Sequence, residues 1–269
     1  MQNDTKVVIV TGASSGIGFR TASYLSSKGY TVFGASRSLV QTDLFEWIKM
    51  DVTSEESVKN AIDYVWNKMG RIDVIINNAG LGLVGPLEET TNDFVERIFK
   101  TNVVGVISVA RVVMPYLRQQ KSGLIINISS IAAAMGLPYR GIYSASKAAV
   151  EIITEALSIE VKNQGITVCS VLPGDIATSI NQNRLVVPLS ETSIYKQEFD
   201  RIQKQIKKEV STAHDPLMIA EAIGKIIESK RPKLHYKVGP FFQRITGALK
   251  IILPQRWFER LLMKFYGIY

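Results

Sequence analysis

The chain is poor in cysteine, because only one of its 269 residues, Cys169, is of this type. A single cysteine excludes an internal disulfide framework and is typical of a reducing compartment, so we expect a cytoplasmic location. Cys169 lies in the apolar sequence ITVCSV, which predicts a buried strand. This setting favours a packing thiol over a nucleophile.

The sequence also lacks metal-ligand clusters and long apolar runs. The histidines, His214 and His235, have no metal-like spacing with other ligands, so we expect no metal site and interpret both as structural or surface groups. The polar start MQNDTK leaves no room for a signal peptide. No stretch approaches the uninterrupted apolar length of a membrane-spanning helix, so we expect a soluble globular protein.

Acidic residues are outnumbered by basic ones, 24 to 32, which gives a formal net charge of +8. Half of this excess lies in residues 241–269, where five basic residues accompany Glu259: Arg244, Lys250, Arg256, Arg260 and Lys264. The rest of the chain is only mildly basic. The charge therefore does not predict a nucleic-acid partner.

Short apolar runs alternate with helical patterns along most of the chain. The runs predict strands at 6–10, 31–36, 47–50, 73–77, 123–129, 166–174 and 234–238. Helical patterns cover 17–28, 54–70, 91–119, 143–165 and 215–229. This alternation predicts parallel βαβ units, hence an α/β fold with a doubly wound parallel sheet and one domain over 1–269.

Glycine-rich or polar segments follow five of the predicted strands. They are TGASSGIG (11–18), SRS (36–38), NNAG (77–80), ISS (128–130) and LPGDIAT (172–178). Because such sheets bind ligands at the carboxyl ends of their strands, the five segments are expected to form one site.

The first two segments predict a dinucleotide. Gly12, Gly16 and Gly18 permit a tight turn whose backbone N–H groups can approach a pyrophosphate at a helix N-terminus, although a glycine-rich turn without a ligand is the alternative. Enzymes selective for NAD(H) usually place a carboxylate after the second strand, where this chain has Ser36 and Arg37. A guanidinium can bind a 2′-phosphate, so we predict NADP(H) rather than NAD(H); a solvated loop arginine is the alternative.

YSASK (143–147) places Tyr143 and Lys147 on one face of a helix. A nearby ammonium would lower the pKa of the phenol from about 10 toward neutrality, so the tyrosine could exchange a proton with a carbonyl or alcohol. The small residues between the two would leave space for a cofactor against the helix.

Taken together, these motifs resemble the short-chain dehydrogenase/reductase family over about residues 6–180. The matching positions are TGASSGIG, NNAG, Asn102 in FKTNVVG, Ser130 in NISSIA, YSASK and PGDIAT (173–178). Ser130 precedes Tyr143 by thirteen positions, the separation that the family uses. Residues 215–239 are similar to the hydroxysteroid- and retinol-dehydrogenase-like branch.

The resemblance implies roles for particular residues. Tyr143 would be the general acid/base, Lys147 would bind the nicotinamide ribose and lower the pKa of the phenol, and Ser130, rather than Ser129, would bind the substrate oxygen. Asn102 would support a water between Lys147 and solvent. The implied cofactor-binding residues are Gly12, Ser14, Ser15, Gly16, Ile17, Gly18, Ser36, Arg37, Asp51, Val52, Asn78, Ala79, Gly80, Tyr143, Lys147, Pro173, Gly174, Ile176 and Thr178.

The expected reaction is hydride transfer between the nicotinamide and a secondary alcohol or ketone. The substrate wall and lid would come from 179–212, whose apolar residues suit a steroid-, retinoid- or lipid-like substrate or serve for packing: Ile180, Leu185, Val186, Val187, Leu189, Ile194, Tyr195 and Phe199. A sugar or acyl-carrier ketone is the alternative substrate. A non-catalytic NADP(H)-binding regulator is the alternative function.

Two further surfaces are expected to make contacts. The helix from Tyr143 has an apolar face with Val150, Ile153, Leu157 and Val161, which in this family builds a homodimer or homotetramer. The extension 240–269 carries an apolar stripe with flanking basic residues: Trp257, Phe258, Leu261, Leu262 and Phe265. We expect this stripe to pack on the protein itself or on a partner subunit; peripheral membrane contact is the alternative.

Overall fold

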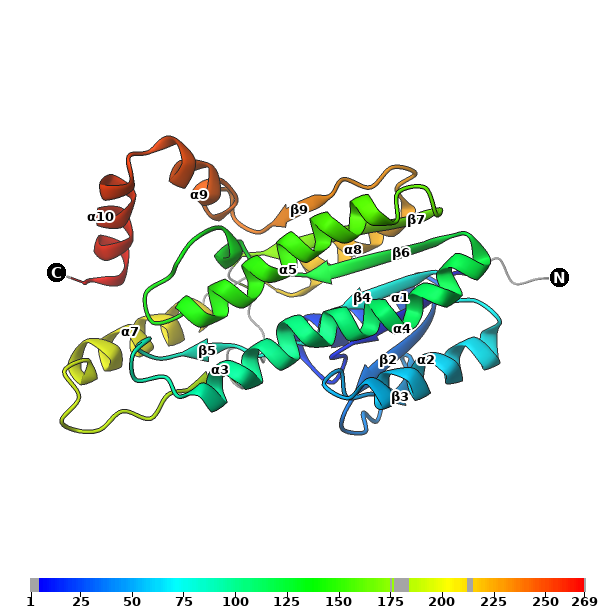
Figure 1. Ribbon diagram of the computed structural model, residues 1–269, viewed down its shortest axis with the longest axis horizontal. Helices are drawn as coiled ribbons and strands as arrows, with labels where there is room; N and C mark the ends of the chain where they lie inside the picture. Colours follow the sequence, from blue (N-terminus) through cyan, green and yellow to red (C-terminus); the bar gives the residue numbers. More distant parts are fainter. Residues whose placement is uncertain (1–4, 175, 177–183, 212–214, 269) are drawn as a thin grey trace.

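Seven parallel strands form the centre of the computed structural model, which describes residues 5–174, 176, 184–211 and 215–268 (Figure 1). The strands are β1 (Val7–Thr11), β2 (Thr31–Ser36), β3 (Glu46–Lys49), β4 (Val74–Asn77), β6 (Gly123–Ile128), β7 (Ile166–Pro173) and β9 (His235–Val238). They lie in the order β3-β2-β1-β4-β6-β7-β9, and each neighbouring pair is parallel. The predicted doubly wound sheet is confirmed.

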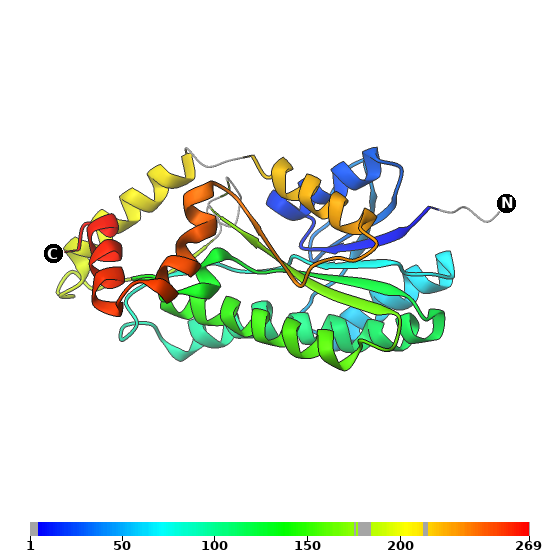
Figure 2. The same ribbon diagram turned by 90° about the horizontal axis from the view of Figure 1, so that it is seen from above.

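Helices cover both faces of this sheet (Figure 2). They are α1 (Gly16–Ser27), α2 (Glu55–Met69), α4 (Gly105–Gln120), α5 (Gly141–Glu160) and α8 (Leu217–Glu228). Helices α2, α4 and α5 lie on one face, and α1 and α8 on the other. In β1, Val7 and Ile9 face the first layer while Val8 and Val10 face the second, so the strand is apolar throughout.

Cys169 lies in the second of these cores and is fully buried, which confirms the packing thiol. Burial raises the pKa of the thiol to about 12, so the group stays protonated at neutral pH.

The predicted helix at 91–119 is one helical run with a wider turn inside it. Helix α3 (Asn92–Phe99) continues through a π-helical turn, η1 (Lys100–Val104), into α4. The run Asn92–Gln120 is long and apolar enough to cross a membrane by length and composition, which the sequence analysis did not expect. Half of its most apolar window is buried inside the protein, as in the core helix of a globular domain.

The apolar face predicted on α5 is partly covered by the protein's own core. Val150 and Val161 are buried, and Ile153 and Leu157 are half-buried. The large apolar side chains that α5 exposes are Ile152 and Ile159, at 64% and 75%. These two residues lie outside the predicted set, and the homodimer or homotetramer expected through α5 stays a prediction.

The remaining elements gather beyond the carboxyl ends of the strands (Figure 1). They are the short strands β5 (Leu83–Val84) and β8 (Leu185–Val186), the 3-10 turn η2 (Ile131–Ala134), and the helices α7 (Lys196–Ser211), α9 (Phe241–Ile252) and α10 (Gln255–Tyr266). Strands β5 and β8 pair in a separate parallel ribbon, which the sequence analysis missed. These elements surround the site on the edge that the sequence indicated.

Candidate active site

The glycine turn between β1 and α1 has no room for side chains at two positions. Gly12 has a φ of +67°, and a Cβ there would lie 2.7 Å from the Cα of Ala79. A Cβ on Gly18 would lie 2.4 Å from the carbonyl oxygen of Gly12. The N-terminus of α1, with no acidic residue in its first turn, therefore stands open to an anion.

Thr11, which the sequence analysis missed, holds the glycine turn against NNAG. Its hydroxyl oxygen accepts hydrogen bonds from the backbone N–H groups of Asn78 and Ala79, both at 3.0 Å. The Asn78 amide in turn donates to the carbonyl oxygens of Thr11 and Gly12 at 2.9 and 3.2 Å. The available signal in the sequence was a polar residue at the end of an apolar strand, and the structure shows that Thr11 is buried there.

A groove of about 180 Å³ runs along the ends of β1, β2 and β4. Twelve predicted cofactor residues line it: Gly12, Ser14, Ser15, Gly16, Ile17, Ser36, Arg37, Asp51, Val52, Asn78, Ala79 and Gly80. Gly18 is buried behind the turn, so its role is packing. Thr178 lies outside the described residues.

Arg37 and Ser36 differ in how they meet this groove. Arg37 is exposed at its edge, whereas Ser36 is buried and its hydroxyl is engaged by other groups. That hydroxyl donates to the carbonyl oxygen of Ser38 at 2.7 Å and accepts from Trp47 Nε1 at 2.8 Å. Arg37 is therefore the better placed of the two to bind a phosphate.

Asp51 carries a negative charge beside the same groove. Partial burial alone would raise its pKa, but hydrogen bonds from the Thr53 backbone and hydroxyl, with the charges of Arg37 and Lys100, lower that pKa below its ordinary value. Asp51 thus stays ionised at neutral pH, within the electrostatic influence of the Arg37 guanidinium.

Ser129 and Ser130 lie at the end of β6 and have different environments. Ser129 is buried and its hydroxyl donates to the carbonyl oxygen of Lys147 at 3.2 Å. Ser130 is half-buried, and its Oγ accepts from the Ala132 N–H at 3.1 Å. Because its oxygen accepts this bond, the Ser130 hydrogen can be donated to a substrate oxygen. Both serines line the catalytic chamber described below, so the role of Ser130 stays a prediction, which its available hydrogen favours.

Lys147 is almost completely buried, with 5% of its surface exposed. Its ammonium donates to the carbonyl oxygen of Ile128 at 2.8 Å. Burial lowers the pKa of Lys147 to about 8, and the negative charge of Glu151 opposes this effect. Lys147 is thus close to losing its proton just above neutral pH.

Asn102 lies in the π-helical turn η1 and joins three segments. Its side-chain oxygen accepts from the Leu81 N–H at 2.7 Å, and its amide donates to the Leu81 carbonyl at 2.9 Å and to Ser146 Oγ at 3.0 Å. A π-helical turn in a helix often marks a functional position. Asn102 lines neither the cofactor groove nor the catalytic chamber described below, so the water expected beside it stays a prediction.

The small residues between Tyr143 and Lys147 take part in packing and hydrogen bonding within the protein. Ser144 and Ser146 are buried and line neither cavity, while Ala145 is exposed. Ser146 donates to the carbonyl oxygen of Tyr143 at 2.7 Å and accepts from Asn102. Ser146 thus ties α5 to η1, and the space that the small residues would leave for a cofactor stays a prediction.

A chamber of about 630 Å³ opens from the groove and holds the predicted catalytic side chains except Asn102. Tyr143, Ser130 and Lys147 line it, as do the predicted cofactor residues Pro173, Gly174 and Ile176. Ile17, Asn78 and Gly82 line both the chamber and the groove, so the two are continuous. A dinucleotide in the groove could extend its nicotinamide toward Tyr143.

Much of the apolar wall of this chamber comes from the C-terminal helices, while Ile180 of the predicted wall lies outside the described residues. Of the described residues of 179–212, only Arg184 lines the chamber. Val187 and Phe199 are buried in two small cores and do not line the chamber, so here the packing alternative holds; the core of Phe199 includes the chamber residue Tyr266. The wall residues of α9 and α10 are Phe242, Thr246, Leu249, Phe258, Leu261, Leu262, Phe265 and Tyr266.

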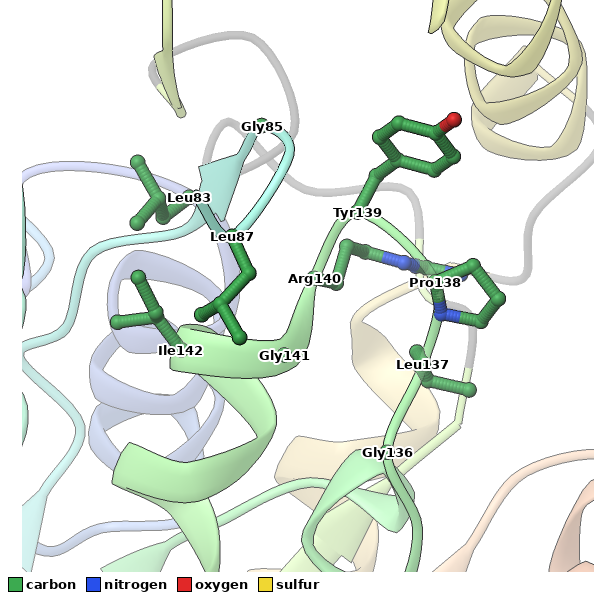
Figure 3. Close-up of a pocket in the computed structure, with 10 residues that line it drawn as sticks. All are labelled: Leu83, Gly85, Leu87, Gly136, Leu137, Pro138, Tyr139, Arg140, Gly141 and Ile142. Carbon is green, nitrogen blue, oxygen red and sulfur yellow. The ribbon is translucent and has the colours of Figure 1, made fainter. Parts of the chain in front are cut away.

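A smaller cavity of about 320 Å³ lies on the other side of the loop before α5 (Figure 3). Leu83, Leu87 and Ile142 gather on one side of it, and Tyr139 points away from them. Leu83, Leu137 and Arg140 line both this cavity and the chamber.

Tyr139 has a φ of +58°, which is strained for a bulky side chain. Its ring packs 5.5 Å from that of Phe199 on α7 and its hydroxyl donates to Glu198, so burial and this bond raise its pKa. These contacts tie the loop that precedes Tyr143 to α7. The sequence carries no signal for this strained position.

A parallel sheet, a glycine turn at a helix N-terminus and a joined chamber with tyrosine, lysine and serine define a dinucleotide-dependent oxidoreductase. The chain belongs to the short-chain dehydrogenase family, because the family model described as "short chain dehydrogenase" matches residues 6–186.

Similar proteins support this assignment over nearly the whole chain. A Bacteroides thetaiotaomicron protein named 3-ketodihydrosphingosine reductase is 41% identical over 98% of this chain and 98% of its own. Human retinol dehydrogenase 8 is 29% identical over 90% of this chain and 84% of its own. The crystal structure of a Streptomyces avermitilis short-chain dehydrogenase is 30% identical, with a TM-score of 0.80, over 99% and 97% of the two chains. Other similar structures hold NAD, NADH or NADP.

Glu151 gives the first testable prediction, because it lies one helical turn after Lys147 and raises the pKa of that lysine. In Glu151→Gln the ammonium loses this stabilisation, so the pKa of Lys147 should fall. If Lys147 must be charged, the alkaline limb of the kcat/KM profile for ketone reduction should move to lower pH by up to about 1 unit. The measurement is kcat/KM against pH.

Glu155→Gln is the matched control, because Glu151 and Glu155 contact the same histidine. His235 Nδ1 lies 2.9 Å from Glu151 Oε2, and His235 Nε2 lies 3.3 Å from Glu155 Oε1. Glu155 lies a further turn away from Lys147 and should leave the limb in place. Equal shifts in both variants would contradict a specific effect of Glu151 on Lys147.

Proposed function

We propose that the protein is an NADP(H)-dependent oxidoreductase that interconverts a ketone and a secondary alcohol on a long-chain, lipid-like molecule. The observation that carries the proposal is the chamber, where Ser130, Tyr143 and Lys147 lie at one end and the apolar side chains of α9 and α10 form the wall. Its volume of about 630 Å³ lies within the range of about 300–1,000 Å³ that is typical of small-molecule sites.

The cofactor would be held by residues whose geometry fits it. The open N-terminus of α1 and the missing Cβ at Gly12 suit a pyrophosphate, and Arg37 suits a 2′-phosphate. Gly80, which lines the groove, lies close to Lys147, since an added Cβ there would be 3.5 Å from Lys147 Nζ. When bound, NADP(H) supplies or accepts the hydride.

The protein's own groups would manage the proton. The Tyr143 hydroxyl would donate to the carbonyl oxygen of a ketone or accept from an alcohol. Ser130 would donate a hydrogen bond to the same oxygen and stabilise its developing charge. The Lys147 ammonium, fixed by the Ile128 carbonyl, would lower the pKa of the Tyr143 phenol.

The substrate class is supported by the chamber wall and by a relative. The wall is mostly apolar along α9 and α10, which favours an aliphatic or isoprenoid chain over a sugar. The Bacteroides relative is named for the reduction of a ketone on a long-chain base. We therefore infer a long-chain ketone, of which 3-ketodihydrosphingosine is the first to test. The regulator alternative finds no support, because Asn102, Ser130, Tyr143 and Lys147 are all present.

Substrate chain length should determine the rate. With NADPH, kcat/KM should rise about fourfold for each methylene that becomes buried, until the chamber is filled. The measurement is NADPH absorbance with a homologous series of aliphatic 3-ketones, 3-ketodihydrosphingosine, a steroid ketone, retinal, a keto sugar and an acyl-carrier ketone. Equal rates on short and long ketones would exclude the lipid-like substrate while leaving the oxidoreductase intact.

Removal of the Tyr143 hydroxyl should stop the reaction. In Tyr143→Phe we expect kcat to fall by about 10²–10⁴-fold, because the proton donor is lost, while the Kd for NADPH changes little. Steady-state turnover and fluorescence titration with NADPH give the two values. Retained turnover would remove Tyr143 from the chemistry.

Arg37 should decide between the two cofactors. In Arg37→Ala the loss of a charge-assisted contact should lower kcat/KM for NADPH by about 10- to 100-fold, with little effect for NADH. Arg37→Lys keeps the positive charge without the planar guanidinium, so its kcat/KM for NADPH should lie between those of the wild type and Arg37→Ala. If wild-type protein has a higher kcat/KM with NADH than with NADPH, the proposed preference is wrong.

A further inference from the structure

The C-terminal helices expose more apolar surface than their place as a chamber wall requires. Of the large apolar side chains that the described residues expose, eight lie between 241 and 265: Phe241, Phe242, Ile251, Ile252, Trp257, Leu261, Met263 and Phe265. Ile251 is 85% exposed and Trp257 63%. In Figures 1 and 2, α9 and α10 lie at one end of the molecule, outside the layers that cover the sheet.

Helix α10 divides its apolar stripe between the protein and the solvent. Phe258 and Tyr266 are buried, and Leu262 is half-buried. Trp257, Leu261 and Phe265, which are spaced by four, are 63%, 53% and 56% exposed. The expected packing on the protein therefore accounts for one side of the stripe and leaves the other uncovered.

A basic stripe runs directly beside the exposed apolar one. Arg256, Arg260 and Lys264 are also spaced by four, each one position before an exposed apolar residue, and all three are exposed. The acid of this helix, Glu259, accepts a hydrogen bond from Gln255 at 2.9 Å. Parallel basic and aromatic stripes are the pattern of a helix that lies in the headgroup region of an anionic bilayer.

Three of these exposed side chains also line the chamber, so the chamber reaches the surface beside them; we call this opening the chamber mouth. Phe242, Leu261 and Phe265 line the chamber and are at the same time 78%, 53% and 56% exposed. The apolar surface is therefore continuous from the outside of α9 and α10 to the space beside Tyr143. A lipid chain could pass along it with little exposure to water.

We propose that α9 and α10 form a docking surface for an anionic lipid bilayer, with the chamber mouth turned toward the lipid. The inference that an apolar substrate enters through this mouth rests on the proposed function. The inference of docking rests on the basic and apolar stripes of α10. Contact would be interfacial, since the helical run long enough to span a membrane, Asn92–Gln120, lies half-buried in the core.

Charge favours a bilayer over a second copy of this chain. In a two-fold dimer the same patch meets itself, so Arg256, Arg260 and Lys264 of both copies would come together. Residues 241–269 hold one acid, Glu259, to offset five basic residues on each copy. An anionic surface neutralises this charge and a second copy adds to it.

Flotation of the full chain with vesicles tests the docking without any need for activity. The protein should float with vesicles of phosphatidylcholine and phosphatidylglycerol in equal parts, should float less with phosphatidylcholine alone, and should be released by salt. Arg256→Glu with Arg260→Glu should lower the bound fraction about tenfold or more. Failure to float, or equal binding to both kinds of vesicle, would overturn the proposal.

Ile252→Ser with Trp257→Ser tests the apolar part, because neither residue lines the chamber. This variant should lose vesicle binding but keep its melting temperature, NADPH affinity and activity on a short, water-soluble ketone. Ile159→Ser is the matched control, since Ile159 on α5 and Ile252 are both 75% exposed, and it should still float.

The remaining outcomes separate this proposal from the proposed function. Light scattering that shows a dimer lost in the C-terminal variants, without vesicle binding in the wild type, would assign the surface to a second copy and overturn the docking. Vesicle binding with no ketone reduced would support the docking and contradict the proposed function.

Discussion

A buried ammonium is the constraint on which this site depends. Burial lowers the pKa of Lys147 and the charge of Glu151, one turn away, opposes this, while the Nζ of Lys147 donates to the Ile128 carbonyl. That hydrogen bond also fixes α5 to the end of β6, which places Tyr143 and Ser130 along one chamber. Electrostatics and architecture are thus set by the same contact, and a charge so poorly solvated is sensitive to small changes around it.

The sheet and most of the cofactor groove could be predicted because they follow from local patterns. Continuous apolar strands with glycine-rich or polar ends indicate a parallel sheet and the edge where it binds ligands. Properties that depend on packing across the fold could not be predicted this way. Gly18 was assigned to the cofactor, yet a Cβ there would strike the Gly12 carbonyl, and only the folded turn reveals this clash.

The substrate wall shows the same limit at a larger scale. Val187 and Phe199 are as apolar as a lipid pocket requires, but they pack in two small cores. The chamber is lined instead by Phe258 and Leu262, which lie at least 59 residues further along the chain. An apolar stripe in the sequence indicates a helix face that packs on protein or meets lipid, but it does not identify which. The division of α10 into a buried and an exposed side therefore became visible only in the structure.

The wider turn at Lys100–Val104 affects how the helical run on either side of it can be used. One added residue in a helical turn advances the direction of every following side chain by about 100°. Helix α4 can therefore turn Val109 and Val113 to the core of the sheet, while Ile98 of α3 packs in a separate small core with Leu83, and the helical run continues without a break. Helices α3 and α4 can thus face different directions. They are joined at the turn that contains Asn102, whose side chain hydrogen-bonds to Leu81 and Ser146.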